Sequence, residues 1–198
     1  MLLYYLIFSS RLNIFQKFNN IPNLDSLILD LRANVGGSID ILPYLLGPFI
    51  GKDQYAYEFF HQNEKTPYKT KVGWLSGLVQ YKKVVILIDD KTQSSAEVMA
   101  SVFKKYNVGI LIGTTTRGWG TIEAVESLDQ KLEEQEYSIF LVHSLTLRTD
   151  GQPIEGNGVE PTININQSDW KEKLYSYFHY SELINAIEEI WNNPPGQI

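Results

Sequence analysis

One segment constrains the fold more than any other, because it reads as a buried strand, a polar turn and an amphipathic helix in direct succession. The segment runs from Val84 to Gly120. It opens with VVILID, a β-branched apolar run of strand length, and the polar residues DDKTQ follow as a break. From Ala96 to Phe103, apolar residues recur at helical spacing. This order predicts a strand–loop–helix unit of an α/β protein.

Ser94 occupies the predicted junction between this strand and this helix. The first turn of a helix leaves backbone N–H groups unpaired and carries the positive end of the helix dipole. These features can stabilise a developing oxyanion, so a serine here has the surroundings of a nucleophile. Glu97 follows three positions later and gives the capping-box spacing S-x-x-E. A plain helix N-cap is therefore the alternative interpretation of Ser94.

Composition bounds the possible functions. A chain of 198 residues with 43% hydrophobic and 13% aromatic content can bury a sizeable core. A net charge of −6 provides no basic surface for nucleic acid, so we expect no such partner. The absence of cysteine excludes disulfides, thiolate metal sites and a cysteine nucleophile. The imidazole ligands available for a metal are those of His61, His143 and His179, and their spacing is not that of a metal site. We therefore expect neither a metal nor an organic cofactor.

The first ten residues, MLLYYLIFSS, contain an apolar run too short to span a bilayer and without the features of a signal peptide. We expect a buried strand here and no membrane span. A chain that starts inside a core strand suggests that its structural unit extends upstream. The expected organisation is one N-terminally incomplete core domain over residues 1–192, with a frayed tail at 193–198.

The rest of the chain repeats the order of strand, loop and helix. The run LDSLILDLR at 24–32 predicts a second buried strand, and ANVGGS after it predicts a tight loop before a helical pattern at 39–49. Together these units favour an α/β architecture with largely buried sheets. The remaining predictions are a helix at 12–18, an aromatic hairpin at 53–70 with its turn near Asn63, strands at 108–113, 137–147 and 162–166, and a helix at 182–191.

Three segments, in order, resemble the C-terminal processing (tail-specific) serine peptidases and their tricorn-like relatives. They are LILDLRANVGG, then TQSSAEVMASVF with LIGTTTRGWG, and finally PIEGNGVEP. The resemblance covers residues 2–165 and implies a Clp protease/crotonase-like core of repeated β-β-α units. It also implies that Ser94 is the nucleophile of a serine endopeptidase, with a protein or peptide as its substrate.

The same resemblance implies an oxyanion hole made of backbone N–H groups near Gly36, Gly37 and Ser95. Glycine lets a substrate carbonyl approach the backbone closely, which gives the diglycine a chemical reason beyond turn formation. A plain strand-to-helix turn is the alternative. An extended substrate, with C-terminal segments favoured, is expected to add as a strand to an exposed sheet edge.

The general base departs from the family pattern. In the C-terminal processing branch a lysine follows the serine by 25 positions, and here that position is Trp119. Tryptophan cannot accept the serine proton, and Arg117 beside it stays protonated, so neither replaces the lysine. The expected serine–lysine dyad is therefore absent.

The tricorn-like branch uses a serine–histidine–glutamate arrangement instead. Glu155 in PIEGNGVEP falls where its glutamate could lie, although a solvated loop carboxylate is the alternative. That branch takes its histidine from before the diglycine, and no histidine precedes His61 here. His143, on the predicted strand YSIFLVHSLTL, is the internal candidate, and Lys91 could also approach Ser94.

Two functional hypotheses follow. The first is a serine endopeptidase core that acts through Ser94. The second is a catalytically silent relative that binds peptides or assembles with partners through the same groove, which Trp119 at the lysine position favours.

Overall fold

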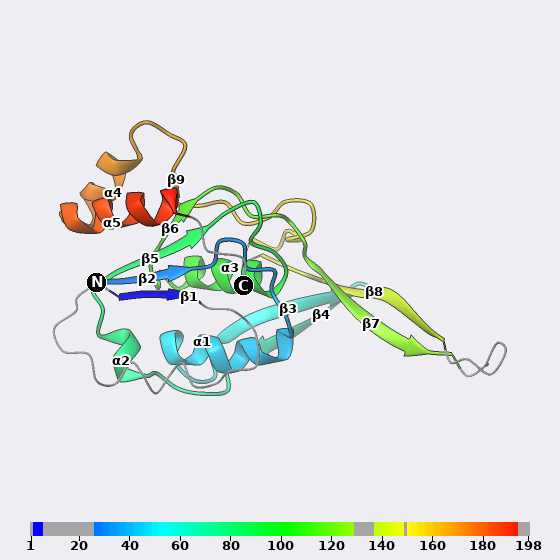
Figure 1. Cartoon of the computed structure of the whole chain (residues 1–198). Helices are drawn as coiled ribbons and strands as arrows, with labels where there is room; N and C mark the ends of the chain where they lie inside the picture. Colours follow the sequence, from blue (N-terminus) through cyan, green and yellow to red (C-terminus); the bar gives the residue numbers. More distant parts are fainter. Residues whose placement is uncertain (1, 6–25, 129–136, 149, 194–198) are drawn as a thin grey trace.

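The computed structural model of the chain describes residues 2–5, 26–128, 137–148 and 150–193 (Figure 1). The helix predicted at 12–18 and nearly all of the predicted tail lie outside these residues. The described elements are β1 (Leu2–Tyr5), β2 (Ser26–Asp30), η2 (Ile39–Ile41), α1 (Leu42–Ile50), β3 (Tyr55–His61), β4 (Glu64–Lys69), α2 (Ser76–Val79), β5 (Lys83–Ile88), α3 (Ser95–Lys105), β6 (Ile110–Gly113), β7 (Thr121–Ser127), β8 (Ser138–Thr146), β9 (Ile163–Asn164), α4 (Trp170–Phe178) and α5 (Ser181–Asn192).

A parallel sheet of five strands, in the order β1-β2-β5-β6-β9, forms the centre of the molecule. Every pair of neighbours in it is parallel, with Leu29 opposite Ile86 and Ile86 opposite Leu111. All five residues of β2 are buried. A strand buried on both faces needs apolar side chains on both, which explains the unbroken runs in the sequence.

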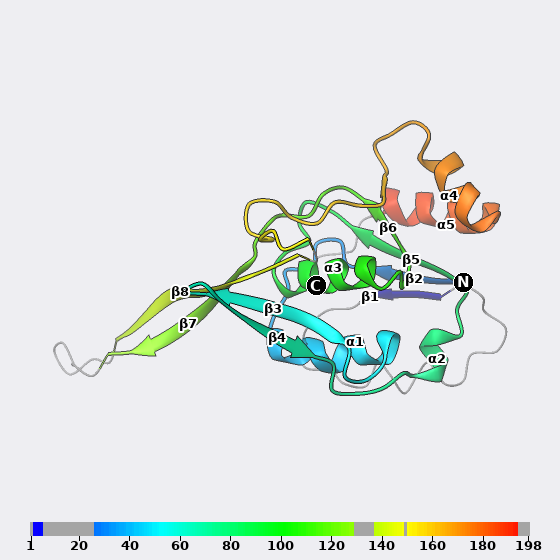
Figure 2. The same cartoon turned by 180° about the vertical axis from the view of Figure 1, so that it is seen from behind.

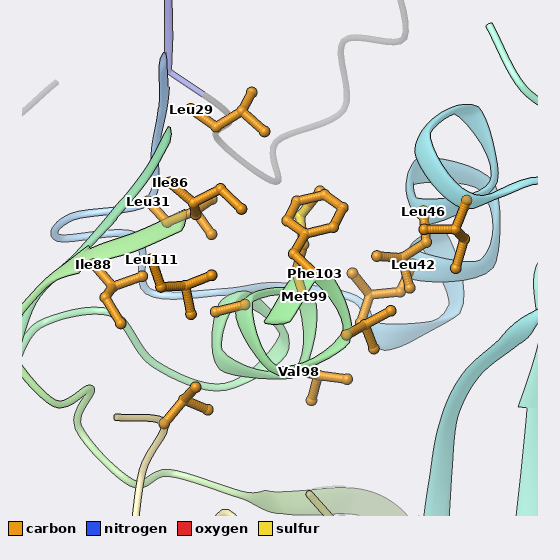
Figure 3. Close-up of a cluster of buried hydrophobic side chains, with 14 of the residues drawn as sticks. Leu29, Leu31, Leu42, Leu46, Ile86, Ile88, Val98, Met99, Phe103 and Leu111 are labelled. Carbon is orange, nitrogen blue, oxygen red and sulfur yellow. The ribbon is translucent and has the colours of Figure 1, made fainter. Parts of the chain in front are cut away.

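The two faces of this sheet pack against different helices. On one face, α3 carries Met99 and Phe103, which are fully buried between the sheet and α1. On the other face, α4 and α5 contribute Trp170, Leu174 and Ile187. Figure 3 shows the first cluster, with side chains gathered around α3 from β2 (Leu29), β5 (Ile86, Ile88), β6 (Leu111) and α1 (Leu42, Leu46).

A second sheet is antiparallel, in the order β4-β3-β8-β7. Its inner part, with Ala56 and Tyr57 of β3, is buried against the core that contains α3. Strand β3 pairs with β8 only at Phe59–Thr146 and Phe60–Leu145. Beyond that point β7 and β8 continue alone and project from the body as a two-stranded arm (Figures 1 and 2).

Most of the predicted elements are present. The strand at 24–32, the hairpin at 53–70, the long strand at 137–147 and the helix at 182–191 correspond to β2, β3–β4, β8 and α5. Strand β7 and the helices α2 and α4 were not predicted. Among the described helices, none has the length and apolar character needed to cross a bilayer.

Candidate active site

Ser94 stands directly before α3 with φ 56° and ψ −131°. An N-cap residue normally has an extended backbone, whereas a positive φ is unfavourable for any residue with a Cβ atom. Such strain persists where the surrounding structure enforces it, and it gathers at functional sites. Ser94 is the N-cap of α3, and its capping box with Glu97 is in place, so the alternative interpretation also holds. Its strained backbone differs from that of an ordinary cap, and the half-buried residue stays accessible.

Hydrogen bonds between the ends of β2 and β5 hold the turn before Ser94. The hydroxyl of Thr92 donates to the carbonyl of Leu31 at 2.8 Å and accepts from the N–H of Asp89 at 3.0 Å. The Asp89 carboxylate accepts from the N–H of Ala33 at 2.9 Å. Because parallel strands end at the same sheet edge, these bonds bring the loop after β2 beside the start of α3.

The diglycine lies against the serine. A Cβ atom built on Gly36 would stand 2.8 Å from the Cβ of Ser94 and 3.0 Å from the nitrogen of Ser95. The φ of Gly36 is +84°, and that of Gly37 is +152°. A side chain at Gly36 would thus meet both steric overlap and backbone strain, so the position requires glycine.

Two backbone N–H groups beside Ser94 are available to a ligand. The N–H of Gly36 is already bonded to the Asn34 side chain at 2.9 Å. Within the described part of the chain, no acceptor is bonded to the N–H of Gly37 or to that of Ser95. These two donors belong to the loop and the helix start that the Gly36–Ser94 contact brings together.

Glu97 connects the serine to the loop after β6. Its side chain is fully buried, and its Oε2 atom accepts from the N–H of Ser94 at 2.9 Å and from that of Trp119 at 2.8 Å. The Oε1 atom accepts from the Thr116 hydroxyl at 2.5 Å and from the N–H of Gly118 at 2.7 Å. One carboxylate therefore has four donors, which satisfy its charge inside the protein.

Glu155 belongs to the closing loop and lies against the same segment. Its exposed carboxylate accepts from the N–H of Gly120 at 2.8 Å. The N–H of Gly156 donates to the carbonyl of Gly118 at 2.9 Å. The structure thus brings Glu155 to the loop that Glu97 ties to Ser94, although the bonds of its carboxylate are to Gly120 and not to the serine.

Trp119 stands at the position of the expected lysine, and its indole points along β7. The indole Nε1–H donates to the Glu123 carboxylate at 3.2 Å, and the Arg117 guanidinium lies 5.8 Å from the ring centre. The side chain is 44% exposed. Only the backbone of Trp119 shares Glu97 with Ser94, so this residue shapes the surface beside the serine without offering it a base.

His143 does not join Ser94 in the described contacts. Its ring stacks on that of His61, with centres 4.2 Å apart and planes 2° apart. Its Nδ1 atom is 2.7 Å from the Ser144 hydroxyl. Lys91 is exposed, and its backbone N–H donates to the Asp89 carboxylate. His143 therefore lies on β8 of the antiparallel sheet, away from the described contacts of Ser94. The residues that the structure does bring together are Ser94, Gly36, Gly37, Ser95 and, through the loop, Glu155.

Two features of the site were missed from the sequence. Glu97 was interpreted only as a capping-box residue, yet three of its four bonds reach the loop at 116–119. Thr116 had no predicted role, yet its hydroxyl also accepts from the N–H of Val159 in the closing loop at 2.7 Å. Across the described ranges, no cluster of three or more histidine, cysteine, aspartate or glutamate side chains is placed to bind a metal.

Comparison with known proteins finds similar sequences among carboxy-terminal processing proteases. Carboxy-terminal processing protease CtpA of Bacillus subtilis is 28% identical over 153 residues, which are 75% of this chain and 30% of that protein. CtpB of the same organism is 27% identical over 149 residues, which are 74% of this chain and 29% of that protein. The chain thus spans about a third of the length of these curated relatives.

Solved structures show the same fold at lower identity. A photosystem II D1 C-terminal processing protease matches 72% of this chain and 35% of its own, with a TM-score of 0.61 and 20% identity. A lipoprotein from Streptococcus agalactiae matches 89% of this chain and 65% of its own, with a TM-score of 0.62 and 21% identity. These matches confirm the predicted fold class. The model of peptidase family S41 matches residues 8–165, and the chain therefore belongs to that family.

Proposed function

We propose that this chain is the core of a serine endopeptidase that cleaves peptide bonds in extended protein segments, with C-terminal segments favoured. The observation that carries the proposal is the contact between Gly36 and Ser94, which sets an accessible, strained serine beside the unbound N–H groups of Gly37 and Ser95. The names of the B. subtilis relatives, both carboxy-terminal processing proteases, support the same reaction and substrate class.

In the proposed mechanism the Oγ atom of Ser94 attacks the scissile carbonyl carbon. The carbonyl oxygen becomes an oxyanion and accepts from the N–H groups of Gly37 and Ser95, which need no reorganisation because the backbone fixes them. The serine proton passes to a base and then to the leaving amine, and water hydrolyses the acyl-enzyme. Neither a metal nor an organic cofactor takes part in these steps.

Glu155 and His143 are the candidate members of the proton relay. We assign Glu155 the role of holding the loop, because its carboxylate is bonded to Gly120. His143 would have to leave its stacking contact with His61 to reach Ser94. Replacing Glu155 with Gln should lower kcat and leave thermal stability nearly unchanged, and replacing His143 with Phe tests the imidazole in the same assay.

A second function is favoured by Trp119. Because no side chain that could accept a proton is bonded to the Ser94 hydroxyl in the described contacts, the same groove could bind peptides without cleaving them. The indole beside Glu123 would then be part of the binding surface. In this case Ser94→Ala should leave peptide affinity unchanged and no product should form with the parent chain.

The experiment that separates these functions incubates the purified chain with a chemically unfolded protein and identifies the products by mass spectrometry. The peptidase predicts new C-termini that appear with the parent chain and are missing with Ser94→Ala. Ser101→Ala is the matched control, because Ser101 lies on α3 and is buried away from the diglycine loop. A folded parent chain that yields no products would overturn the peptidase and leave the binding function.

A further inference from the structure

The arm formed by β7 and β8 presents an exposed edge that begins beside the candidate active site. In the strand order β4-β3-β8-β7, β7 is the outer strand, so one side of its backbone has no neighbour among the described strands. Strand β7 starts at Thr121, immediately after Gly120, which is bonded to Glu155. Trp119, one residue earlier, shares the Glu97 carboxylate with Ser94.

The hydrogen bonds to β8 decide which backbone groups of β7 face outward. At one end Gly120 accepts from the N–H of Thr146, and at the other the N–H of Leu128 donates to Tyr137. Bonded and unbonded positions alternate along an antiparallel strand. The ladder has an irregularity between Ile122 and Glu123, where the register on β8 shifts by one residue. The count on β7 is the same from either end, and the N–H and C=O groups that point away from β8 are those of Thr121, Glu123, Val125 and Ser127.

The side chains of β7 give this edge a chemical character. Val125 is 66% exposed, and its cross-strand neighbour Phe140 is 68% exposed. Glu123 and Glu126 are the charged residues of β7, and the described residues of β7 and β8 include no lysine or arginine. In a sheet, residues directly opposite each other interact most strongly, and opposite charges or apolar pairs are favoured there.

We infer that the outer edge of β7 is the docking strand for the substrate, and that the substrate segment it binds is extended, with basic residues opposite the two glutamates and an aliphatic residue opposite Val125. This inference rests on the proposed function and names the surface and substrate class of the same site. Strand β7 begins directly after the loop at 116–120, and Glu97 bonds both that loop and Ser94. A peptide bound along β7 would therefore extend toward Ser94. The acidic edge selects against a second acidic arm and in favour of a basic segment.

The experiment measures peptide affinity by fluorescence anisotropy with the Ser94→Ala chain, so that binding is separate from cleavage. The probe is a labelled peptide that contains Lys-Val-Ala-Lys, which in antiparallel pairing places lysines opposite Glu126 and Glu123 and valine opposite Val125. The same peptide with glutamate in place of each lysine is its matched counterpart. Val125→Pro removes one outward N–H and leaves the β8 ladder intact, whereas Val125→Thr keeps that N–H. We expect Val125→Pro to weaken binding of the basic peptide about tenfold and Val125→Thr to leave it within about twofold.

Two further measurements keep the test decisive. If Val125→Pro fails to fold, the lysine probe N-methylated at alternate residues tests the same bonds on the Ser94→Ala chain and should bind about tenfold more weakly. Glu126→Lys leaves one charge of each sign on β7 and should remove most of the preference between the two peptides. Equal affinity of Val125→Pro and Val125→Thr would overturn the inference, as would a dimer in sedimentation that Val125→Pro dissociates and Val125→Thr does not. A chain that binds the peptides but cleaves nothing would overturn only the proposed function.

Discussion

At the scale of single residues, the account depends on one close approach between two loops. Gly36 and Gly151 have similar positive φ values, +84° and +80°, but their surroundings differ. A Cβ atom on Gly36 would overlap Ser94 and the carbonyl oxygen of Gln93, whereas one on Gly151 would meet nothing within 4 Å. Substituting each glycine with alanine therefore separates the cost of backbone strain, which both share, from the cost of steric overlap with Ser94, which only Gly36 has.

Gly36→Ala should destabilise the chain more than Gly151→Ala. Both variants carry the strain of a positive φ, about 1 kcal/mol. Only Gly36→Ala adds steric overlap, which costs about 1–3 kcal/mol more. Chemical denaturation measures both. Equal losses of unfolding free energy would show that Gly36 is not packed against the serine.

Glu97→Gln should lower stability and displace the loop at 116–119. A glutamine has one acceptor oxygen where the carboxylate has two, and its amide N–H₂ group would face donors. Each buried donor left unpaired costs about 1–3 kcal/mol. The matched control is Glu155→Gln, where an exposed carboxylate loses part of one bond and the expected cost is below about 1 kcal/mol. Thermal denaturation of both variants checks this, and equal midpoints would contradict it.

At the scale of the elements, the strands and helix next to Ser94 could be predicted because they carry strong local signals. Strand β5 is an unbroken apolar run, and α3 repeats apolar residues at helical spacing. Strand β7 could not be predicted, because TIEAVES carries a glutamate on each face and becomes a strand only through its pairing with β8.

The same contrast applies to the candidate site. The approach of Gly36 to Ser94 could be predicted, because both follow strands of one parallel sheet, whose ends meet at the same edge. The bonds from Glu97 to the loop at 116–119 could not, because they depend on how that loop folds back over α3. Neighbours along the sequence carry no signal for such a contact.

Two tyrosines of strand β3, Tyr55 and Tyr57, make the stability of the fold decrease at alkaline pH. Burial, and then the charge of Glu58, raise the pKa of Tyr55 to about 12. Burial, and then Asp40, raise the pKa of Tyr57 further. Because both folded pKa values lie above the unfolded value of about 10, folding favours the neutral phenols. Their contribution to stability is fully present below pH 10 and is lost as the pH rises through the folded values.

Unfolding free energy should therefore fall from about pH 10 upward. In Tyr57→Phe this fall should be smaller, because one phenol no longer titrates. Tyr44→Phe, which changes an exposed ring, is the control and should follow the parent. Urea denaturation at a series of pH values measures this, and a Tyr57→Phe profile that matches the parent would contradict the assignment.

At the scale of the whole molecule, a buried ion pair ties the C-terminal helix to the strand that leads into the diglycine loop. Arg32 is bonded to Asp30 at 2.7 Å, and both side chains are almost completely buried. The guanidinium also donates to the carbonyl of Trp191 at 3.3 Å and lies 5.1 Å from the centre of the Trp191 ring system. The end of α5 is thus fixed against the chain segment that precedes Gly36.

Arg32→Met should cost about 3–5 kcal/mol, because it leaves the buried Asp30 carboxylate without its partner. Arg148→Met is the control, since it breaks the ion pair with the exposed Asp150 carboxylate and should cost below about 1 kcal/mol. Denaturation curves of the two variants give the difference. A loss of similar size in both would mean that the buried pair does not hold α5.

The most direct measurement of the central claim is covalent labelling of the folded chain with a fluorophosphonate probe, followed by mapping of the modified residue. The account predicts a label on Ser94 that is absent from Ser94→Ala, strongly reduced in Gly36→Ala and retained in Gly151→Ala. A folded parent chain that stays unlabelled, or a label that remains after Ser94→Ala, would contradict the assignment of Ser94 as the nucleophile.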